Sequence, residues 1–243
     1  MRRRLKQAIK RRLARLACRH LGLYPDPPAL VSEMGHPIGL IRHLGLECRG
    51  VIHVGANLGL EFNSYRRVGL ENVVYIEPIP EIFAKLQARI SVDRRHRAIN
   101  ALCTDRIGDE VDFHVASNGG ESSSIFEFGT HTHHHPQVSY VRTLRLRTTT
   151  LDHIIFETPS LDPRLFDCLV LDVQGAEAKV IAGAKQTLGL CRFVFAEVSE
   201  GGLYKGDATT EEIVETLKAE GFILKSLDIN RFGWGNAFFV KAQ

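Results

Sequence analysis

The 243-residue chain lacks the features that define disulfide-stabilised, zinc-binding and membrane-spanning proteins. Its five cysteines are odd in number and no two have CxxC spacing, which argues against a disulfide framework and a cysteine zinc site. No run of about 18 apolar residues could form a spanning helix, and the N-terminus has no apolar signal-peptide core. We therefore expect a cytoplasmic protein with reduced thiols.

Acidic residues outnumber basic residues outside the first 20 residues. Residues 1–20 carry nine Lys/Arg and no acid, which leaves 22 of the 31 basic residues against all 28 acidic ones in the remaining chain. A nucleic-acid-binding enzyme usually carries its positive charge on the folded body. The distribution therefore predicts no nucleic-acid partner.

The N-terminal segment has the pattern of a basic amphipathic helix over residues 2–20. Apolar residues recur there at helical spacing: Leu5, Ile9, Leu13 and Leu16. Such a helix can lie on an anionic membrane, here the inner face, or pack on its own domain or on a second copy in a homo-oligomer. Prolines then predict a linker over residues 21–48: Pro25, Pro27, Pro28 and Pro37. We expect the folded domain over residues 49–243.

From residue 50 onward, short apolar runs alternate with helical patterns. The expected strands are 51–54, 73–76, 98–102, 169–172, 193–198, 222–229 and 237–241. The expected helices are 58–68, 80–90, 176–188 and 210–220. This alternation predicts a Rossmann-like α/β fold, with a mostly parallel seven-stranded sheet, helices on both faces and a C-terminal antiparallel hairpin. A polar insert at about residues 114–147 is expected to act as a lid.

A glycine turn follows the first expected strand, in the motif Val54-Gly55-Ala56-Asn57-Leu58-Gly59. Gly55 allows a sharp turn and a close approach of a ligand to the backbone. The second strand ends at Glu77, where a carboxylate can accept hydrogen bonds from both hydroxyls of a ribose. Together they predict an adenosine-containing cofactor. The GxxxG spacing is not the GxGxxG dinucleotide fingerprint, which favours S-adenosylmethionine over NAD.

A second candidate site surrounds Asp172, which ends the fourth expected strand at the ligand-binding edge of the sheet. Methyl transfer requires alignment of the acceptor oxygen and removal of its proton. Asp172 is therefore predicted to be the base or to orient the acceptor. Glu177 is either a second catalytic acid or a charge that stabilises the next helix N-terminus. Asp172 and Glu197 could together hold Mg²⁺, although we favour two substrate-binding acids without a metal.

The insert contains a histidine tract at His131, His133, His134 and His135. A stable metal site needs three or four converging ligands, so we expect these side chains to be mainly solvated in the lid. An imidazole titrates near neutral pH. His135 is therefore kept as an alternative general base.

These motifs resemble, in their order along residues 50–225, the FkbM family of methyltransferases. The resemblance rests on residues 54–59 and on four further blocks: Ile76-Glu77-Pro78-Ile79-Pro80, Ser122-Ser123-Ser124, Thr149-Thr150-Leu151-Asp152 and Leu171-Asp172-Val173-Gln174-Gly175-Ala176-Glu177. It implies a class I methyltransferase fold, S-adenosyl-L-methionine as cofactor, and O-methylation of a hydroxyl on a sugar or cell-surface glycan. One position departs, since His53 stands where most members have Asp.

The resemblance and the motifs together give a set of predicted cofactor-binding residues: His53, Gly55, Ala56, Asn57, Gly59, Glu77, Pro78, Ala101, Leu102 and Asp172. Two other functions remain open at this stage. One is an NAD-dependent oxidoreductase, and the other is a non-catalytic cofactor-binding module recruited by its basic helix. The sequence does not identify the acceptor.

Overall fold

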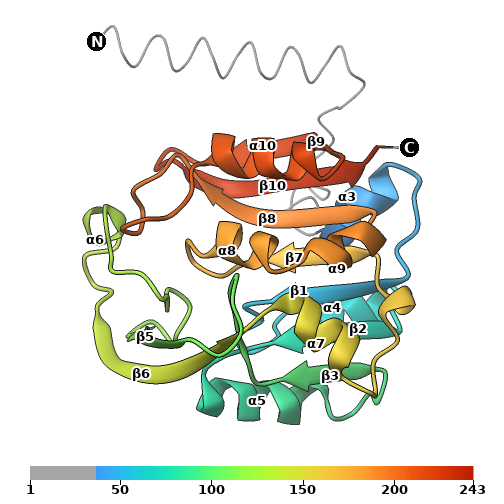
Figure 1. The fold of residues 1–243 in the computed structure, drawn as a ribbon, viewed down its shortest axis with the longest axis horizontal. Helices are drawn as coiled ribbons and strands as arrows, with labels where there is room; N and C mark the ends of the chain where they lie inside the picture. The colour runs from blue at the N-terminus through green and yellow to red at the C-terminus, as the bar shows by residue number, and fades with distance from the viewer. Residues whose placement is uncertain (1–36, 243) are drawn as a thin grey trace, which may run out of the picture.

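A seven-stranded sheet forms the centre of the computed structural model, which describes residues 37–242 (Figure 1). Its strand order is β3-β2-β1-β7-β8-β10-β9. The bounds are β1 Gly50–Val54, β2 Asn72–Ile76, β3 His96–Ile99, β7 Cys168–Leu171, β8 Phe193–Ser199, β9 Phe222–Ile229 and β10 Trp234–Lys241. Strand β10 is antiparallel to both neighbours, and the other pairs are parallel. The Rossmann-like α/β fold with a closing hairpin is confirmed.

Helices cover both faces of this sheet. One layer consists of α3 Pro37–His43, α4 Phe62–Arg67 and α5 Pro80–Ile90, and the other of α7 Leu151–Glu157, α8 Glu177–Ala182, α9 Lys185–Leu190 and α10 Thr210–Ala219. Successive residues of a strand point to opposite faces. Val51 therefore packs with the α3–α5 layer, whereas Ile52 and Val54 pack with the α7–α10 layer.

The insert folds into a hairpin at one end of the sheet, on the left of Figure 1. Strand β5 Glu110–Ala116 pairs antiparallel with β6 Tyr140–Thr149, β6 also pairs with the short β4 Leu102–Cys103, and α6 His131–His134 lies between β5 and β6. Phe113 packs with Ile79 and Ile82 beside α5. The loop between β5 and β6 is bound to the segment after β8 by backbone hydrogen bonds, including Thr130 N to Gly202 O at 2.7 Å and Lys205 N to Glu127 O at 2.8 Å.

The predicted linker over residues 21–48 is wrong in the part that the structure describes. Pro37 begins helix α3, and Ile38 and Ile41 are buried in the core. A proline is tolerated in the first turn of a helix because the N–H that it lacks has no partner inside the helix. The domain core therefore reaches back to at least Pro37.

Two other expected elements are interrupted. The strand expected over 98–102 ends at Ile99, and Leu102 continues as β4, paired with β6. The helix expected over 176–188 breaks at Gly183 into α8 and α9. A side chain at Gly183 would collide with the backbone oxygen of Thr104, so a contact distant in sequence determines this break.

The predicted amphipathic helix over residues 2–20 lies outside the described residues. Within residues 37–242, no helix has the length and apolar character needed to cross a membrane.

Candidate active site

The loops that follow β1 and β7 meet at Gly55. Its φ is +81°, and an added Cβ would collide with the backbone oxygen of Asp172. Both the left-handed conformation and the lack of space require glycine here. This close approach places Asp172 directly beside the loop that follows β1.

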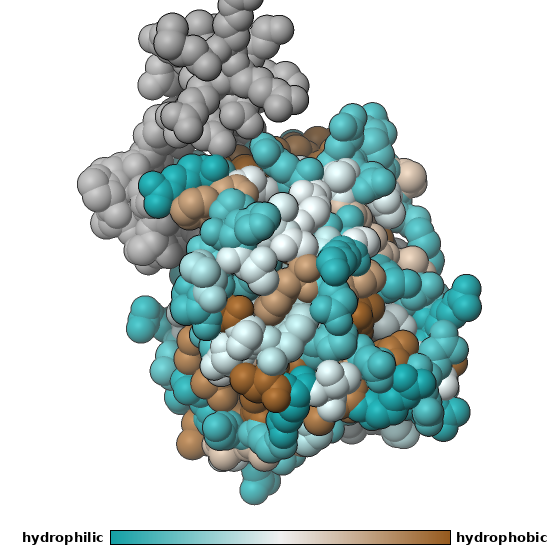
Figure 2. All heavy atoms as spheres, turned by 90° about the vertical axis from the view of Figure 1, so that its left-hand side faces the viewer, coloured by the Kyte–Doolittle hydropathy of each residue, from teal (hydrophilic) through white to brown (hydrophobic). Residues whose placement is uncertain are grey.

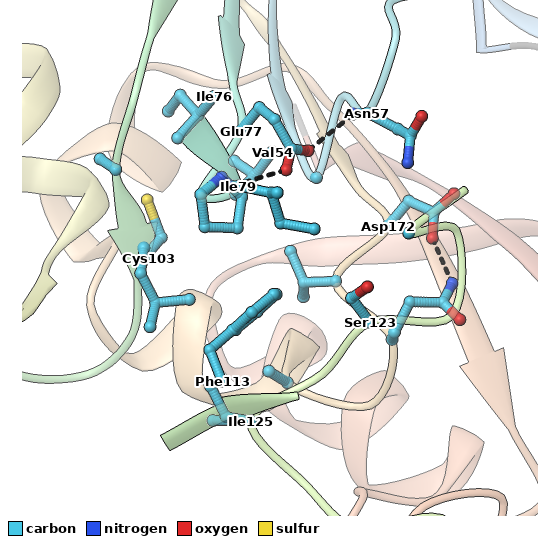
Figure 3. A pocket seen from close by; sticks show the side chains of 18 of the residues that line it. Val54, Asn57, Ile76, Glu77, Ile79, Cys103, Phe113, Ser123, Ile125 and Asp172 are labelled. Carbon is cyan, nitrogen blue, oxygen red and sulfur yellow. Dashed lines mark hydrogen bonds between the residues drawn. The ribbon is translucent and has the colours of Figure 1, made fainter. Parts of the chain in front are cut away.

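Glu77 is fixed at the end of β2, where it is only 4% exposed. Its Oε2 accepts the Asn57 N–H at 2.9 Å and its Oε1 accepts the Ile79 N–H at 2.8 Å (Figure 3). Burial raises the pKa of Glu77 to about 7, against these two hydrogen bonds, which lower it. Each carboxylate oxygen has a further lone pair, so the fixed group can still accept two ligand hydroxyls.

A cavity, here called the Glu77 cavity, opens beside this carboxylate. Strand ends supply one wall, including Val54, Ile76 and Leu102. The insert supplies an apolar wall through Phe113 and Ile125 (Figure 3). No Lys or Arg lines it in the described residues. Apolar walls beside a hydroxyl-binding carboxylate fit an adenosine without phosphates, which is the nucleoside part of S-adenosylmethionine.

A second and larger cavity, here called the Trp234 cavity, adjoins the first. The two share five lining residues: Gly55, Asn57, Glu121, Asp172 and Gln174. Polar and aromatic side chains make up part of the remaining lining of the Trp234 cavity, which also includes the aliphatic Leu60, Val138 and Leu203: His53, Glu61, His131, His135, Glu197 and Trp234. On the side of the molecule where the insert lies, hydrophilic residues alternate with small hydrophobic patches (Figure 2). Two adjoining cavities that meet at Asp172 suit a transfer between two bound molecules.

Gln174 holds the carboxylates of Asp172 and Glu197 through one amide group. Its Nε2 donates to Asp172 Oδ1 and to Glu197 Oε2, both at 2.6 Å. Its Oε1 accepts the Tyr204 hydroxyl at 2.6 Å, and its backbone oxygen accepts Ser124 Oγ at 2.7 Å. Gln174 also has a left-handed φ of +55°, a strained conformation typical of functional sites.

The same contacts bear on charge and on metal binding. Asp172 is exposed toward the two cavities, and desolvation by their walls raises its pKa, while the Gln174 hydrogen bond lowers it. The amide nitrogen occupies the place between Asp172 and Glu197 that a cation would take. This geometry therefore does not support the Mg²⁺ alternative at Asp172 and Glu197. No group of three or more His, Cys, Asp or Glu side chains in residues 37–242 is arranged to hold a metal ion.

Comparison with known proteins identifies the family. Residues 53–224 match the profile of the methyltransferase FkbM domain. The chain belongs to this family. The 2-O-methyltransferase NoeI of Sinorhizobium fredii is 28% identical over 174 residues, which cover 69% of this chain and 70% of NoeI.

Solved structures with a similar fold are more distant. One is the magnesium protoporphyrin IX methyltransferase of Synechocystis with bound S-adenosylmethionine, at 11% identity and a TM-score of 0.42, covering 79% of this chain and 69% of that one. Another is an S-adenosylmethionine-dependent methyltransferase from Aquifex aeolicus, at 8% identity and a TM-score of 0.46, covering 90% and 100%. The family match identifies an S-adenosylmethionine-dependent methyltransferase, in place of the oxidoreductase and the non-catalytic module.

Most predicted cofactor-binding residues of this FkbM-family methyltransferase line the Glu77 cavity: Gly55, Asn57, Glu77, Pro78, Ala101, Leu102 and Asp172. His53 and Ala56 line only the Trp234 cavity. Gly59 lines neither, because its α-carbon packs against Leu86, where a side chain would collide with Cδ1. Its assignment to cofactor binding is corrected to helix packing.

Glu177 also lies outside both cavities. It is 7% exposed, and its Oε1 accepts the Val173 N–H at 2.9 Å, so it fixes the turn that follows Asp172. Burial raises its pKa to about 7. The predicted direct catalytic role is therefore corrected to positioning of this turn, in which it stabilises the start of α8.

His131 is buried rather than solvated, with 4% exposure and its ring stacked on Phe128 at 4.3 Å. Asn118 Oδ1 accepts the Ser122 N–H, so Asn118 Nδ2 donates to Ser122 Oγ. The Ser122 hydroxyl also forms a hydrogen bond with His131 Nε2 at 3.0 Å. Burial lowers the pKa of His131 to about 4. A neutral imidazole with Nε2 already engaged is a poor general base, whereas His135 lines the Trp234 cavity and stays a candidate.

Sequence reasoning missed several residues that line the two cavities. Phe113 and Ile125 belong to the insert, whose polar composition gave no sign of an apolar wall. Gln174 stands in the motif of the second candidate site, but its role depends on a turn conformation that the motif does not specify. Trp234 lies outside the motifs of the sequence analysis, and it lines a cavity.

Proposed function

We propose that this methyltransferase transfers the methyl group of S-adenosylmethionine to a hydroxyl oxygen of a sugar. The observation that carries the proposal is the lining of the Trp234 cavity, which meets the Glu77 cavity at Asp172. A sugar hydroxyl both donates and accepts hydrogen bonds. The cavity offers carboxylates as acceptors, imidazole and indole N–H groups as donors, and an aromatic ring on which a sugar can stack.

Two buried atoms support a polar acceptor. His131 Nδ1 and Trp234 Nε1 are inaccessible and have no hydrogen-bond partner among the described residues. Buried polar atoms without partners are rare in folded proteins. Both residues line the same cavity, which agrees with a ligand that supplies hydrogen-bond acceptors after a small adjustment of the side chains. The name of NoeI, a 2-O-methyltransferase, also agrees with oxygen as the atom methylated.

In this proposal each residue has a defined task. S-adenosylmethionine supplies an electrophilic methyl group when bound. Glu77 accepts hydrogen bonds from the two ribose hydroxyls, and Phe113 and Ile125 face the adenine ring. Asp172 takes the proton of the acceptor hydroxyl where the cavities meet, and Gln174 holds its carboxylate in place. Desolvation by the cavity walls raises the pKa of Asp172 and makes it a stronger base than an aspartate in free solution.

Transfer from labelled S-adenosylmethionine to a panel of methyl glycosides, among them a methyl glucuronide and a methyl glucosaminide that also offer a carboxylate and an amine, tests the proposal. The expected product is a methyl ether, which survives alkali, and two-dimensional NMR would assign its position on the ring. A labelled product that alkali releases would indicate a methyl ester, and a labelled amine would indicate nitrogen as the acceptor. Either result would contradict transfer to a hydroxyl.

We further propose that residues 1–20 bring the enzyme to an anionic membrane surface. Nine Lys/Arg without an acid support this, since each contributes on the order of 1 kcal/mol near such a surface. Co-sedimentation with vesicles should require anionic lipid and weaken as salt shortens the Debye length. Equal sedimentation of the full chain and of a chain that starts at Pro25 would contradict this role.

A further inference from the structure

We infer that the Trp234 cavity selects sugars that carry no negative charge. This inference rests on the proposed transfer to a sugar and adds a rule for its acceptor. Four carboxylates line the cavity: Glu61, Glu121, Asp172 and Glu197. No Lys or Arg is among its described lining residues. An acceptor therefore meets acidic groups without a cation beside them.

The four carboxylates of this cavity, two exposed and two half-buried, have different partners from Asp93 and Asp167, which are buried. Asp93 is paired with Arg95 at 2.9 Å, and Asp167 with Arg49 at 3.2 Å. By contrast, no ion pair within residues 37–242 involves any of the four cavity carboxylates. Asp172 and Glu197 are bridged instead by the neutral amide of Gln174. Within the described residues, the acids of this cavity therefore have no arginine or lysine partner.

Two of the three histidines that line the cavity do not offset this charge. Burial lowers the pKa of both His53 and His131 to about 4, so both are neutral at pH 7. The raised pKa of Asp172 and Glu197 allows the pair to hold one proton. S-adenosylmethionine has a positive sulfonium, a positive ammonium and a negative carboxylate. Its net positive charge therefore offsets one further negative charge of the cavity. With both offsets, the cavity still repels an anion.

The positions of Glu61 and Glu121 make them the carboxylates to vary. Glu121 is exposed and lines both cavities, and Glu61 precedes α4 and lines only the Trp234 cavity. Neither is held by a neighbouring side chain as Asp172 and Glu197 are by Gln174. Their charge can therefore be removed with little change in the Asp172 geometry.

The test compares matched pairs of sugars that differ in one carboxylate. Methyl glucoside is measured against methyl glucuronide, and methyl galactoside against methyl galacturonide. A tenfold ratio corresponds to 1.4 kcal/mol, and we expect kcat/KM for the uronides to be at least tenfold lower. Equal or higher kcat/KM for the uronides would overturn the inference.

A non-sugar pair separates this inference from the proposed function. If benzyl alcohol is methylated and no sugar is, the proposed sugar acceptor is wrong. The charge rule is then judged on benzyl alcohol against 4-(hydroxymethyl)benzoate, with the same tenfold criterion. Absence of transfer to every compound would overturn both proposals.

Variants then locate the selectivity. The double variant Glu61→Gln/Glu121→Gln should reduce the ratio between neutral and acidic sugars by about threefold or more, the size of effect of partly exposed charges. Glu157→Gln, at the exposed end of α7 and outside both cavities, should leave the ratio unchanged. Calorimetric binding of S-adenosylhomocysteine checks that each variant is folded. An unchanged ratio in the double variant would contradict the assignment to these carboxylates.

Discussion

The Glu77 and Trp234 cavities are held by different parts of the protein. In the Glu77 cavity, backbone N–H groups fix the carboxylate and the ends of the strands supply most of the wall. In the Trp234 cavity, polar and aromatic side chains from separate elements contribute to the lining, including His53 of β1, Glu197 of β8 and Trp234 of β10. Five residues belong to both cavities: Gly55, Asn57, Glu121, Asp172 and Gln174. The cofactor side thus depends on the regular fold, whereas the acceptor side depends on side chains that can vary without disturbing it. The following substitutions test this division.

The largest effect is expected at the junction, from Asp172→Asn. The amide keeps the shape but cannot take the acceptor proton, so kcat should fall by about 10²- to 10⁴-fold, the usual contribution of a general base. Binding of S-adenosylhomocysteine should change little, since the charge of Glu77 is untouched. Asp228→Asn, on the edge strand β9, is the control. A rate within about tenfold of wild type would direct attention to His135.

The next effect should be confined to the cofactor side. Glu77→Gln removes the charge that receives the two ribose hydroxyls, so affinity for S-adenosylhomocysteine should fall by about 1.5–3 kcal/mol. Glutamine retains one side-chain oxygen, which can still accept the N–H of either Asn57 or Ile79. Alanine would leave both N–H groups without this partner. Calorimetry measures the loss, with the surface variant Glu81→Gln as control. Unchanged affinity would mean that the cofactor binds elsewhere.

Glu77 should also impose a pH dependence on stability. Its pKa of about 7 in the folded state exceeds the ordinary value of 4.5, so the folded state binds more protons between these values. Its favourable contribution is complete below pH 4.5 and is lost as pH rises through 7. His53 and His131, with lowered pKa values, change stability in the opposite direction. The pH dependence of the wild-type unfolding free energy therefore does not isolate the contribution of Glu77.

The difference between two proteins isolates this contribution. The unfolding free energy of Glu77→Gln minus that of wild type should rise by about 1–2 kcal/mol between pH 5 and 7, since one pKa unit corresponds to 1.36 kcal/mol. Urea unfolding at several pH values measures it. A difference that is flat with pH would show that Glu77 titrates normally in the folded protein.

The smallest effect should be confined to the acceptor side. Trp234→Phe retains an aromatic ring but removes the Nε1 donor, so KM for the sugar should rise by a factor that corresponds to about 0.5–1.5 kcal/mol. Affinity for S-adenosylhomocysteine should not change. Weaker binding of S-adenosylhomocysteine together with an unaltered KM for the sugar would contradict the division between the two cavities.

The sequence predicted the elements that depend on local pattern. Strand β2 is an uninterrupted apolar run, buried on both faces, and Glu77 follows it at the spacing of a ribose-binding acid. The sharp turn at Gly55 was predicted because few residues other than glycine adopt its backbone conformation. Along the parallel strands the local hydrophobic pattern and the final packing agree, and the prediction succeeded there.

The misses share one physical cause, which is a partner distant in sequence. Gly183 divides the helix because the Thr104 backbone lies against it. His131 is buried because Ser122 and Phe128 surround it. Gln174 bridges acids from two strands, and only the completed sheet brings these strands together. No periodicity or motif reports such contacts.

Trp234 is the only tryptophan in the 243-residue chain, and it lines the cavity proposed for the acceptor. The intrinsic ultraviolet emission of the protein therefore arises almost entirely from one ring at that place. Quenching or a wavelength shift on addition of a sugar would report occupancy of the acceptor side directly, without a dye or turnover. The enzyme thus contains a built-in optical probe with which libraries of candidate acceptors could be screened.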